Sequence, residues 1–219
     1  MGEAELIPAA QQLIIHSTLF FYGNVVTDAL AAQVAKDIAC HWNEPAATVK
    51  IGGLEYRVVF DIEGIWSKSL TPEMVFENES PRNNYFRIAE YAMNNISFVD
   101  SLPCNTGYFK LDNLLNNSTT AAHEYGHTLG LPHPNNLDIR GKGQPGIMYP
   151  RGTICDPAFH YDPLAAPGAK GGTLNPFTRK VLQSDIDALQ LHRLAFDKNG
   201  KAVIGGFSDV FHEDHLPAE

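Results

Sequence analysis

The chain has 219 residues, 44% of them hydrophobic, and it carries 25 acidic against 16 basic side chains, for a formal net charge of −9. This length and apolar content are enough for one globular domain with a sizeable core, and we expect a single domain over residues 1–219. No basic stripe occurs, which argues against nucleic acid or an anionic membrane as a partner. No apolar run approaches the roughly 18 residues that a transmembrane helix needs, so no membrane-spanning segment is expected. The oligomeric state is not indicated.

The N-terminal part predicts strands around one helix. Residues 11–22 are rich in β-formers and predict a buried strand. Residues 27–42 predict an amphipathic helix, because apolar side chains recur at spacing four on one face. Two β-rich segments, 48–51 and 54–62, are separated by Gly52-Gly53, which indicates a hairpin.

The middle of the chain gives weaker patterns. Residues 66–95 are expected to be irregular, with a short helical piece over 85–93. Residues 95–100 and 107–112 predict short strands. The second of these contains Gly107, Tyr108 and Phe109. We expect this strand either to pack within the sheet or to form an edge that pairs with a substrate backbone.

The C-terminal part is predicted to be mostly loop. Residues 134–178 are rich in proline and glycine. A helix is expected over 184–192, and Asn199-Gly200 predicts a hairpin turn between 194–196 and 202–204. The whole order of elements predicts an α/β fold with a mixed twisted sheet. A cleft is expected between an upper part ending near residue 133 and a loop-rich lower part.

Three further groups have simple expectations. Cys104 and Cys155 flank the central motif in loops, and unpaired thiols are preferred over a bridge between them, which stays open. His160 is expected to be a solvated loop residue. The tail 212–215 is expected to be plainly polar.

The stretch from residue 123 to 133 is His-Glu-Tyr-Gly-His-Thr-Leu-Gly-Leu-Pro-His. On a helix, His123 and His127 are one turn apart and project from the same face, so both Nε2 atoms can reach one ion at about 2.1 Å. Glu124 is rotated by about 100° around the helix axis. Its carboxylate is therefore expected beside the metal, where it can take a proton from water.

Gly130 is expected to end this helix, because glycine accepts the positive φ that reverses the chain. The reversal returns His133 to the third ligand position. Three protein ligands leave a fourth position for water, which is typical of catalytic zinc sites and not of closed structural ones. A random chain of this length would match these five positions about once in 10⁵. Two alternatives stay open, a surface helix that happens to carry histidines and a zinc site that has lost catalysis.

This spacing, His-Glu-x-x-His-x-x-Gly-x-x-His, resembles the signature of metzincin zinc metallopeptidases. The segment 146–150, Gly-Ile-Met-Tyr-Pro, is similar to the methionine turn of the matrixin branch, and the run 182–190 resembles the last matrixin helix. The resemblance covers about residues 107–192. It implies a metzincin-like zincin fold in which one zinc is held by three histidines with Glu124 as the base. Met148 would lie below them, in a turn completed by Tyr149 and Pro150.

The chain also departs from the matrixin pattern. Gly152 stands where matrixins place an aromatic wall residue, so their side-chain preferences do not carry over. The loop before Met148 is longer, and Pro150 replaces the tyrosine of astacins and serralysins. A calcium ion stays possible but is not indicated by any motif. The N-terminus does not have the pattern of a signal peptide, but the resemblance favours a secreted or cell-envelope protein.

Together these features predict a zinc-dependent endopeptidase that acts on a protein or peptide substrate. Two interpretations from other classes stay open. One is a metzincin-like binding module that holds a protein partner without cleaving it. The other is a narrow-target protease that serves as a toxin domain.

Overall fold

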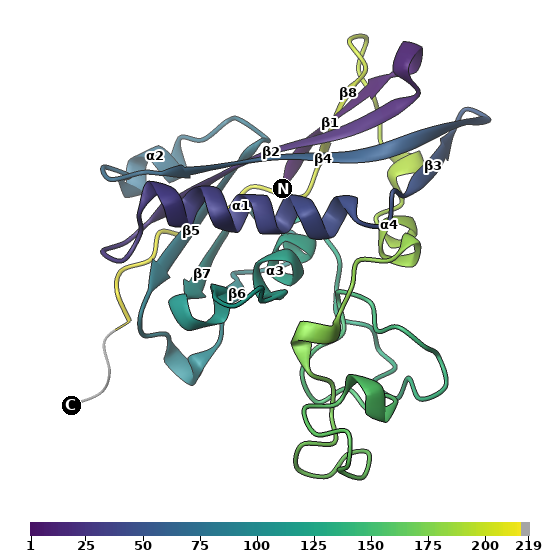
Figure 1. Ribbon diagram of the computed structural model, residues 1–219. Coiled ribbons are helices and arrows are strands. Elements are labelled where there is room, and N and C mark those ends of the chain that lie inside the picture. Colours follow the sequence, from purple (N-terminus) through teal and green to yellow (C-terminus); the bar gives the residue numbers. More distant parts are fainter. Residues whose placement is uncertain (216–219) are drawn as a thin grey trace.

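The structure, a computed structural model, describes residues 1–215 and combines a mixed β-sheet with helices and a loop-rich lower part (Figure 1). The predicted domain range of 1–219 therefore ends in residues 216–219, which lie outside the described part. The strands are β1 (Gly2–Ile7), β2 (Gln12–Tyr22), β3 (Thr48–Ile51), β4 (Leu54–Trp66), β5 (Asn83–Ala89), β6 (Phe98–Val99), β7 (Thr106–Lys110) and β8 (Lys201–Ile204). The helices are α1 (Asp28–Asn43), α2 (Pro72–Phe76), α3 (Thr120–Thr128) and α4 (Gln183–Ala188). The expected α/β class with a mixed sheet is confirmed, and no described helix is long and apolar enough to cross a bilayer.

Strand β2 lies at the centre of the sheet. Along one side it pairs in parallel with β4. Its other side is divided, because residues 12–16 pair antiparallel with β1 and residues 18–22 pair in parallel with β5. The sheet continues from β4 to β3, from β5 through β7 to β6, and from β1 to β8. The predicted hairpin of β3 and β4 is confirmed, although β4 extends to Trp66.

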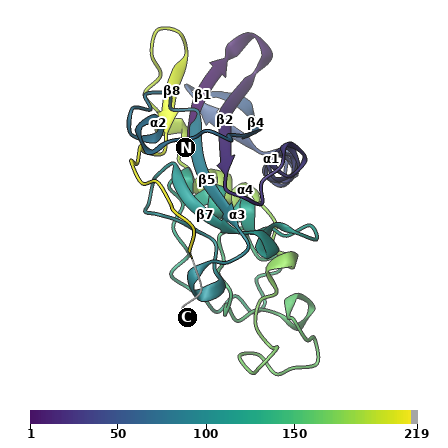
Figure 2. The same cartoon turned by 90° about the vertical axis from the view of Figure 1, so that its left-hand side faces the viewer.

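Helix α1 packs against the sheet through β4, and it also contacts α3. Thr27 caps α1, its hydroxyl accepting the backbone N–H of Leu30 at 3.1 Å. Gly64 in β4 permits the close approach of α1, since a Cβ there would lie 2.2 Å from a carbonyl oxygen of the helix. Trp42, at the end of α1, donates its indole N–H to the carbonyl of Ala122 in α3 at 3.0 Å. Figure 2 views α1 nearly end-on beside β2 and β4. This contact fixes the helix that carries the histidine motif.

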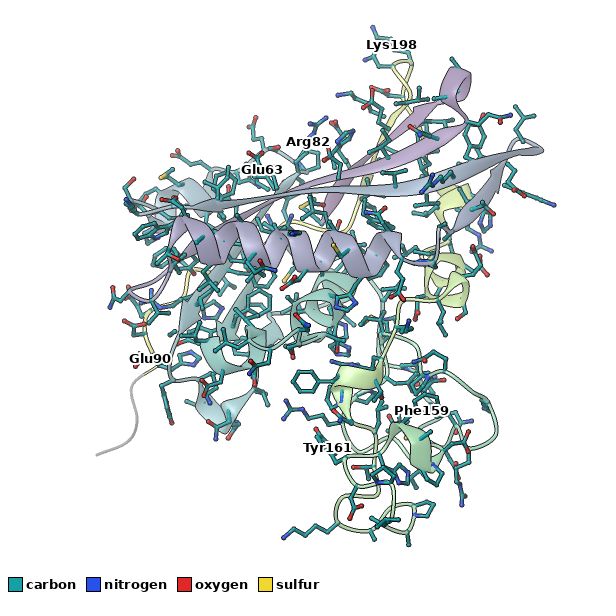
Figure 3. The ribbon with its side chains drawn as sticks, in the orientation of Figure 1. Glu63, Arg82, Glu90, Phe159, Tyr161 and Lys198 are labelled. Carbon is teal, nitrogen blue, oxygen red and sulfur yellow. The ribbon has the colours of Figure 1, made fainter. Side chains whose placement is uncertain are left out.

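The loop-rich lower part spans residues 134–182 and hangs below the sheet in Figure 1. Three isolated bridges hold it together, between Asp138 and Ile154, Gly146 and Lys180, and His160 and Leu174. Figure 3 shows Phe159 and Tyr161 there, far from Glu63 of β4 and from Arg82, which precedes β5. The expectation that His160 is solvated is wrong, because its ring is buried and its Nε2 lies 3.0 Å from the carbonyl of Cys155.

Two segments differ from their predicted structure. The helical piece expected over 85–93 is wrong, since Asn83–Ala89 forms β5, a strand buried between β2 and β7. The turn at Asn199-Gly200 is present, but residues 194–196 form no strand, and β8 pairs with β1 instead. Both errors have one cause. Strands β5 and β8 pair with strands that are distant in sequence, and such pairing leaves no local sequence pattern.

The remaining predictions have mixed outcomes. The helix expected over 184–192 begins at Gln183 and ends at Ala188. Cys104 and Cys155 are buried and unpaired, so the bridge left open does not form. The tail is expected to be plainly polar, but its residues also pack against strands β5 and β7. Asp214 accepts a hydrogen bond from Arg87 at 2.9 Å, and the ring of His215 stacks on Tyr108 at 4.1 Å.

Candidate functional site

Helix α3 presents the motif, and its first turn is tied to the lower part of the molecule. The sequence predicts Ser118 or Thr119 as its cap. Thr119 occupies the capping position, but its hydroxyl makes no bond to the helix. It donates instead to the carbonyl of Pro176 at 2.7 Å and accepts from the guanidinium of Arg179. Ser118 supplies the missing acceptor, bonding the N–H of Thr120 at 3.1 Å.

The end of α3 is a Schellman motif, as the glycine predicts. Gly130 has a φ of 99°. Its N–H bonds the carbonyl of His127 at 3.0 Å, and the N–H of Leu131 bonds the carbonyl of Gly126 at 3.0 Å. A side chain at Gly130 would strain this reversal. The turn brings His133 back against the helix.

The three predicted histidines converge on one point. The Nε2 atom of His133 lies 3.0 Å from that of His123 and 3.1 Å from that of His127. Their ligand atoms all lie within 4.8 Å of one another, so the three side chains could hold one metal ion. Nitrogen atoms bound tetrahedrally at about 2.1 Å would be separated by about 3.4 Å, which is close to this spacing.

Hydrogen bonds at the far side of two rings set their protonation. Nδ1 of His123 lies 2.7 Å from the carbonyl of Ile147, and Nδ1 of His127 lies 2.6 Å from the carbonyl of Leu131. A carbonyl only accepts, so each Nδ1 carries the proton and each Nε2 keeps its lone pair. Burial lowers the pKa of His127 to about 4 and that of His123 well below its usual 6.5. Neutral rings with converging lone pairs are suited to a cation.

Glu124 lies beside these rings and is not one of the three ligands. Its side chain is 7% exposed. Burial raises its pKa to about 8, although the charge of Arg179 and a backbone hydrogen bond from Val99 oppose this shift. A cation held by the three histidines would lower this raised pKa and favour the carboxylate.

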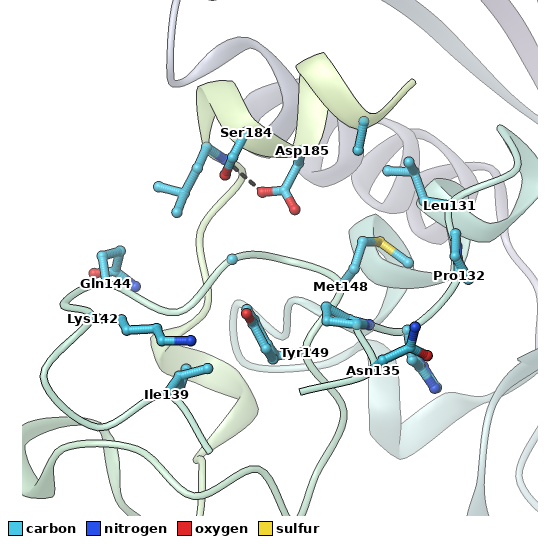
Figure 4. A pocket seen from close by; sticks show the side chains of 15 residues that line it. Leu131, Pro132, Asn135, Ile139, Lys142, Gln144, Met148, Tyr149, Ser184 and Asp185 are labelled. Atoms are coloured by element: carbon cyan, nitrogen blue, oxygen red, sulfur yellow. Dashed lines mark hydrogen bonds between the residues drawn. The ribbon is translucent and has the colours of Figure 1, made fainter. Parts of the chain in front are cut away.

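Met148 packs directly against α3. A Cβ built at Gly126 would lie 2.4 Å from the Met148 sulfur, so the glycine makes room for the methionine. Met148 and Tyr149 face a hollow of about 500 Å³ that also contains Asp185 (Figure 4), which we call the Asp185 hollow. Pro150 lines a different hollow, described next.

A second hollow, of about 410 Å³, contains the general-base candidate and is called the Glu124 hollow. It is lined by Asn95, Ile96, Ser97, Phe98, Val99, Asn113, Thr120, His123, Glu124, His127, His133, Pro150, Arg151 and Arg179. His133 lines both hollows, so they meet at the three-histidine cluster.

The strand beside the Glu124 hollow is β6 and not the one predicted. Strand β7 pairs with β5 on one side and with β6 on the other. Gly107, Tyr108 and Phe109 are therefore inside the sheet, so packing within the sheet is the alternative that the structure shows, and the edge alternative is not. Strand β6 (Phe98–Val99) pairs with the outer side of β7 and forms the edge of the sheet.

Arg179 is the site residue that the sequence did not reveal. Its side chain is 5% exposed, and its Nη1 donates to the carbonyl of Tyr149 at 3.0 Å and lies 3.0 Å from Nδ1 of His123. Burial lowers its pKa to about 10, so it stays charged at neutral pH. Nothing in the local sequence Pro-Phe-Thr-Arg signals this position, because its partners lie about 30 and 60 residues away.

Comparisons with known protein families and with curated proteins find no match to this chain.

Proposed function

We propose that this protein is a zinc-dependent endopeptidase of the metzincin type. The observation that carries the proposal is the convergence of three Nε2 atoms beside a buried carboxylate that is not a ligand. Two of the rings have their Nδ1 protons held by carbonyl groups, an arrangement that metal-bound histidines commonly have. The methionine turn behind α3 and the open hollow in front of it agree with this function.

The chain's own groups have definite roles in this proposal. A bound zinc ion supplies Lewis-acid chemistry, lowering the pKa of water and polarising a carbonyl group. Glu124 takes the proton from the attacking water and later delivers it to the leaving amine. The carbonyl groups of Ile147 and Leu131 hold the rings of His123 and His127 in the tautomer that leaves Nε2 free. The peptide would lie in the Glu124 hollow, beside the β6 edge.

The test is cleavage of a denatured protein by the zinc-loaded chain. Cleavage should occur, stop with a chelator and return with added zinc. Glu124→Ala should keep zinc and the fold while losing at least about a hundredfold in kcat/KM, since general acid–base catalysis contributes about 10²–10⁴-fold. A variant that retains parental cleavage would place the base elsewhere. If neither protein cleaves anything and both bind a partner equally, the binding-module alternative is correct.

A narrow-target protease would behave differently from a general endopeptidase and from a binding module. It would leave general substrates intact and yet cut one protein in a mixed extract, with loss of that cut in Glu124→Ala. Mass spectrometry of the extract before and after incubation distinguishes this outcome.

A further inference from the structure

The Glu124 hollow is positively charged on a protein that is acidic as a whole. The chain has a formal net charge of −9. Among the described residues that line the hollow, Arg151 and Arg179 are cationic and Glu124 is the only carboxylate. The metal position at the three histidines adds further positive charge whenever it is filled. The charge of the hollow therefore has the opposite sign to the net charge of the chain. This positive charge favours the binding of anions in the hollow.

Arg179 is a buried charge without an anionic partner in contact. Its N–H groups are bonded by neutral oxygens, the Thr119 hydroxyl and the carbonyls of Pro176 and Tyr149. No carboxylate of residues 1–215 lies within 4.0 Å of it, although it is 5% exposed. The charge of Glu124 acts on Arg179 without contact, so the guanidinium has no anionic hydrogen-bond partner to offset its desolvation cost.

Arg151 provides a second, accessible cation at the same hollow. It follows Pro150 of the methionine turn and is exposed to solvent. Within the described part of the chain its guanidinium makes no hydrogen bond or ion pair. A guanidinium presents paired N–H groups that match a carboxylate in a bidentate arrangement.

The position of Glu124 identifies which substrate residue meets these cations. In the proposed reaction Glu124 delivers a proton to the leaving amine, so the residue that contributes this amine lies closest to Glu124. Its side chain enters the hollow on the Glu124 side of the histidines. The Asp185 hollow, on the other side of His133, has Lys142 and Asp185 with opposite charges and does not select by sign.

We infer that the Glu124 hollow binds an acidic side chain, so that the protein cleaves peptide bonds preferentially on the amino side of Asp or Glu. This inference rests on the proposed endopeptidase function and adds the class of substrate. Arg151 contacts the carboxylate at the rim of the hollow, and Arg179 supplies charge from its base.

The experiment has two stages. First, the zinc-loaded chain digests a randomised decapeptide library, and mass spectrometry gives the frequency of each residue directly after the cut. Asp and Glu should be enriched there over Asn and Gln. Second, three peptides identical except for Glu, Gln or Lys at that position are compared by kcat/KM. The Glu peptide should be preferred over the Gln peptide by about tenfold, as for a charge-assisted hydrogen bond.

Variants of Arg151 test the assignment of the residue. Arg151→Gln should reduce the Glu-to-Gln ratio severalfold, and Arg151→Glu should shift preference toward the Lys peptide. Arg193→Gln is the matched control, because Arg193 is exposed and bonds only Gln190 outside the hollow, and it should leave the ratio unchanged. The ratio is internal to each protein, so a general loss of activity does not imitate the effect. Arg179→Gln should reduce the ratio as well, with circular dichroism to confirm folding.

The outcomes separate the two proposals. Equal cleavage of the Glu and Gln peptides by the parent would overturn the acidic preference and leave the endopeptidase function standing. Absence of any cleavage, both of the library and of proteins in the mixed extract, would overturn the endopeptidase function. Affinity selection of the uncut library on Glu124→Ala then decides the preference alone. Enrichment of acidic peptides that is lost in Glu124→Ala/Arg151→Glu supports acidic recognition by the hollow, and its absence rules this out.

Discussion

Nδ1 of His123 lies 2.7 Å from the carbonyl oxygen of Ile147, so the residue that precedes Met148 orients the first histidine of the motif. The two residues are 24 positions apart and belong to different parts of the molecule, α3 and the methionine turn. The site is therefore assembled from both parts, and its geometry depends on the packing between them.

The first prediction concerns the metal. The purified parent should carry about one zinc ion, and His133→Ala should lower the occupancy because two ligands bind far more weakly than three. Elemental analysis after dialysis measures this. His192→Ala, which changes an exposed histidine outside the cluster, is the control. Full zinc in the His133 variant, or none in the parent, would contradict the assignment.

The second prediction concerns Met148, which is 3% exposed. Met148→Leu conserves volume and should retain zinc and most activity, with a loss of stability below about 1.5 kcal/mol. Met148→Glu buries a charge and should lose both zinc and folded stability. Urea unfolding and metal analysis give the two results. A stable, zinc-loaded glutamate variant would show that this position is not enclosed.

The third prediction concerns the contact between α3 and the methionine. Gly126→Ala would place a Cβ 2.4 Å from the Met148 sulfur and 3.2 Å from the ring of Trp42. Helix propensity alone favours alanine by about 1 kcal/mol. Overpacking should prevail and destabilise the protein by about 1–3 kcal/mol. The double variant Gly126→Ala/Met148→Ala removes the clash and should be less destabilised than the sum of the two single variants. Additive losses would show that the two sites do not interact.

The fourth prediction concerns acid. Burial lowers the pKa of His127 from 6.5 to about 4. The unfolded chain therefore binds a proton more readily than the folded one between these values. Stability from this group is complete above pH 6.5 and is lost as the pH falls toward 4.

The measurement compares metal-free parent with His127→Gln, which cannot take up this proton. The free energy of unfolding of the parent should decrease relative to the variant between neutral pH and about pH 5. Glu124, whose raised pKa acts in the opposite direction, is present in both proteins and cancels. A constant difference across this range would show that His127 titrates alike in both states.

The histidine site was predictable because its information is local. Eleven consecutive residues contain the ligands, the base and the glycine that reverses the chain. Arg179 and the Val99 contact were not predictable, since they reach Glu124 from other elements. Strand β5 was missed for a related reason. It is buried on both faces, so it shows no alternation, and its polar Asn84 and Arg87 are satisfied by Met1 and Asp214 at distant parts of the chain.

The pairing of β1 with β8 has a consequence for how the protein folds. On the side away from β2, residues 2–5 pair with residues 201–204. During synthesis one edge of β1 therefore stays unpaired until nearly the whole sheet and the loop-rich lower part have been made. Contacts of such sequence separation slow folding, and an open strand edge invites association with other chains. Glu3 and Arg82, which donates to the Glu3 carboxylate at 3.1 Å, place charge along this edge. Such charge disfavours pairing with a second molecule before β8 arrives.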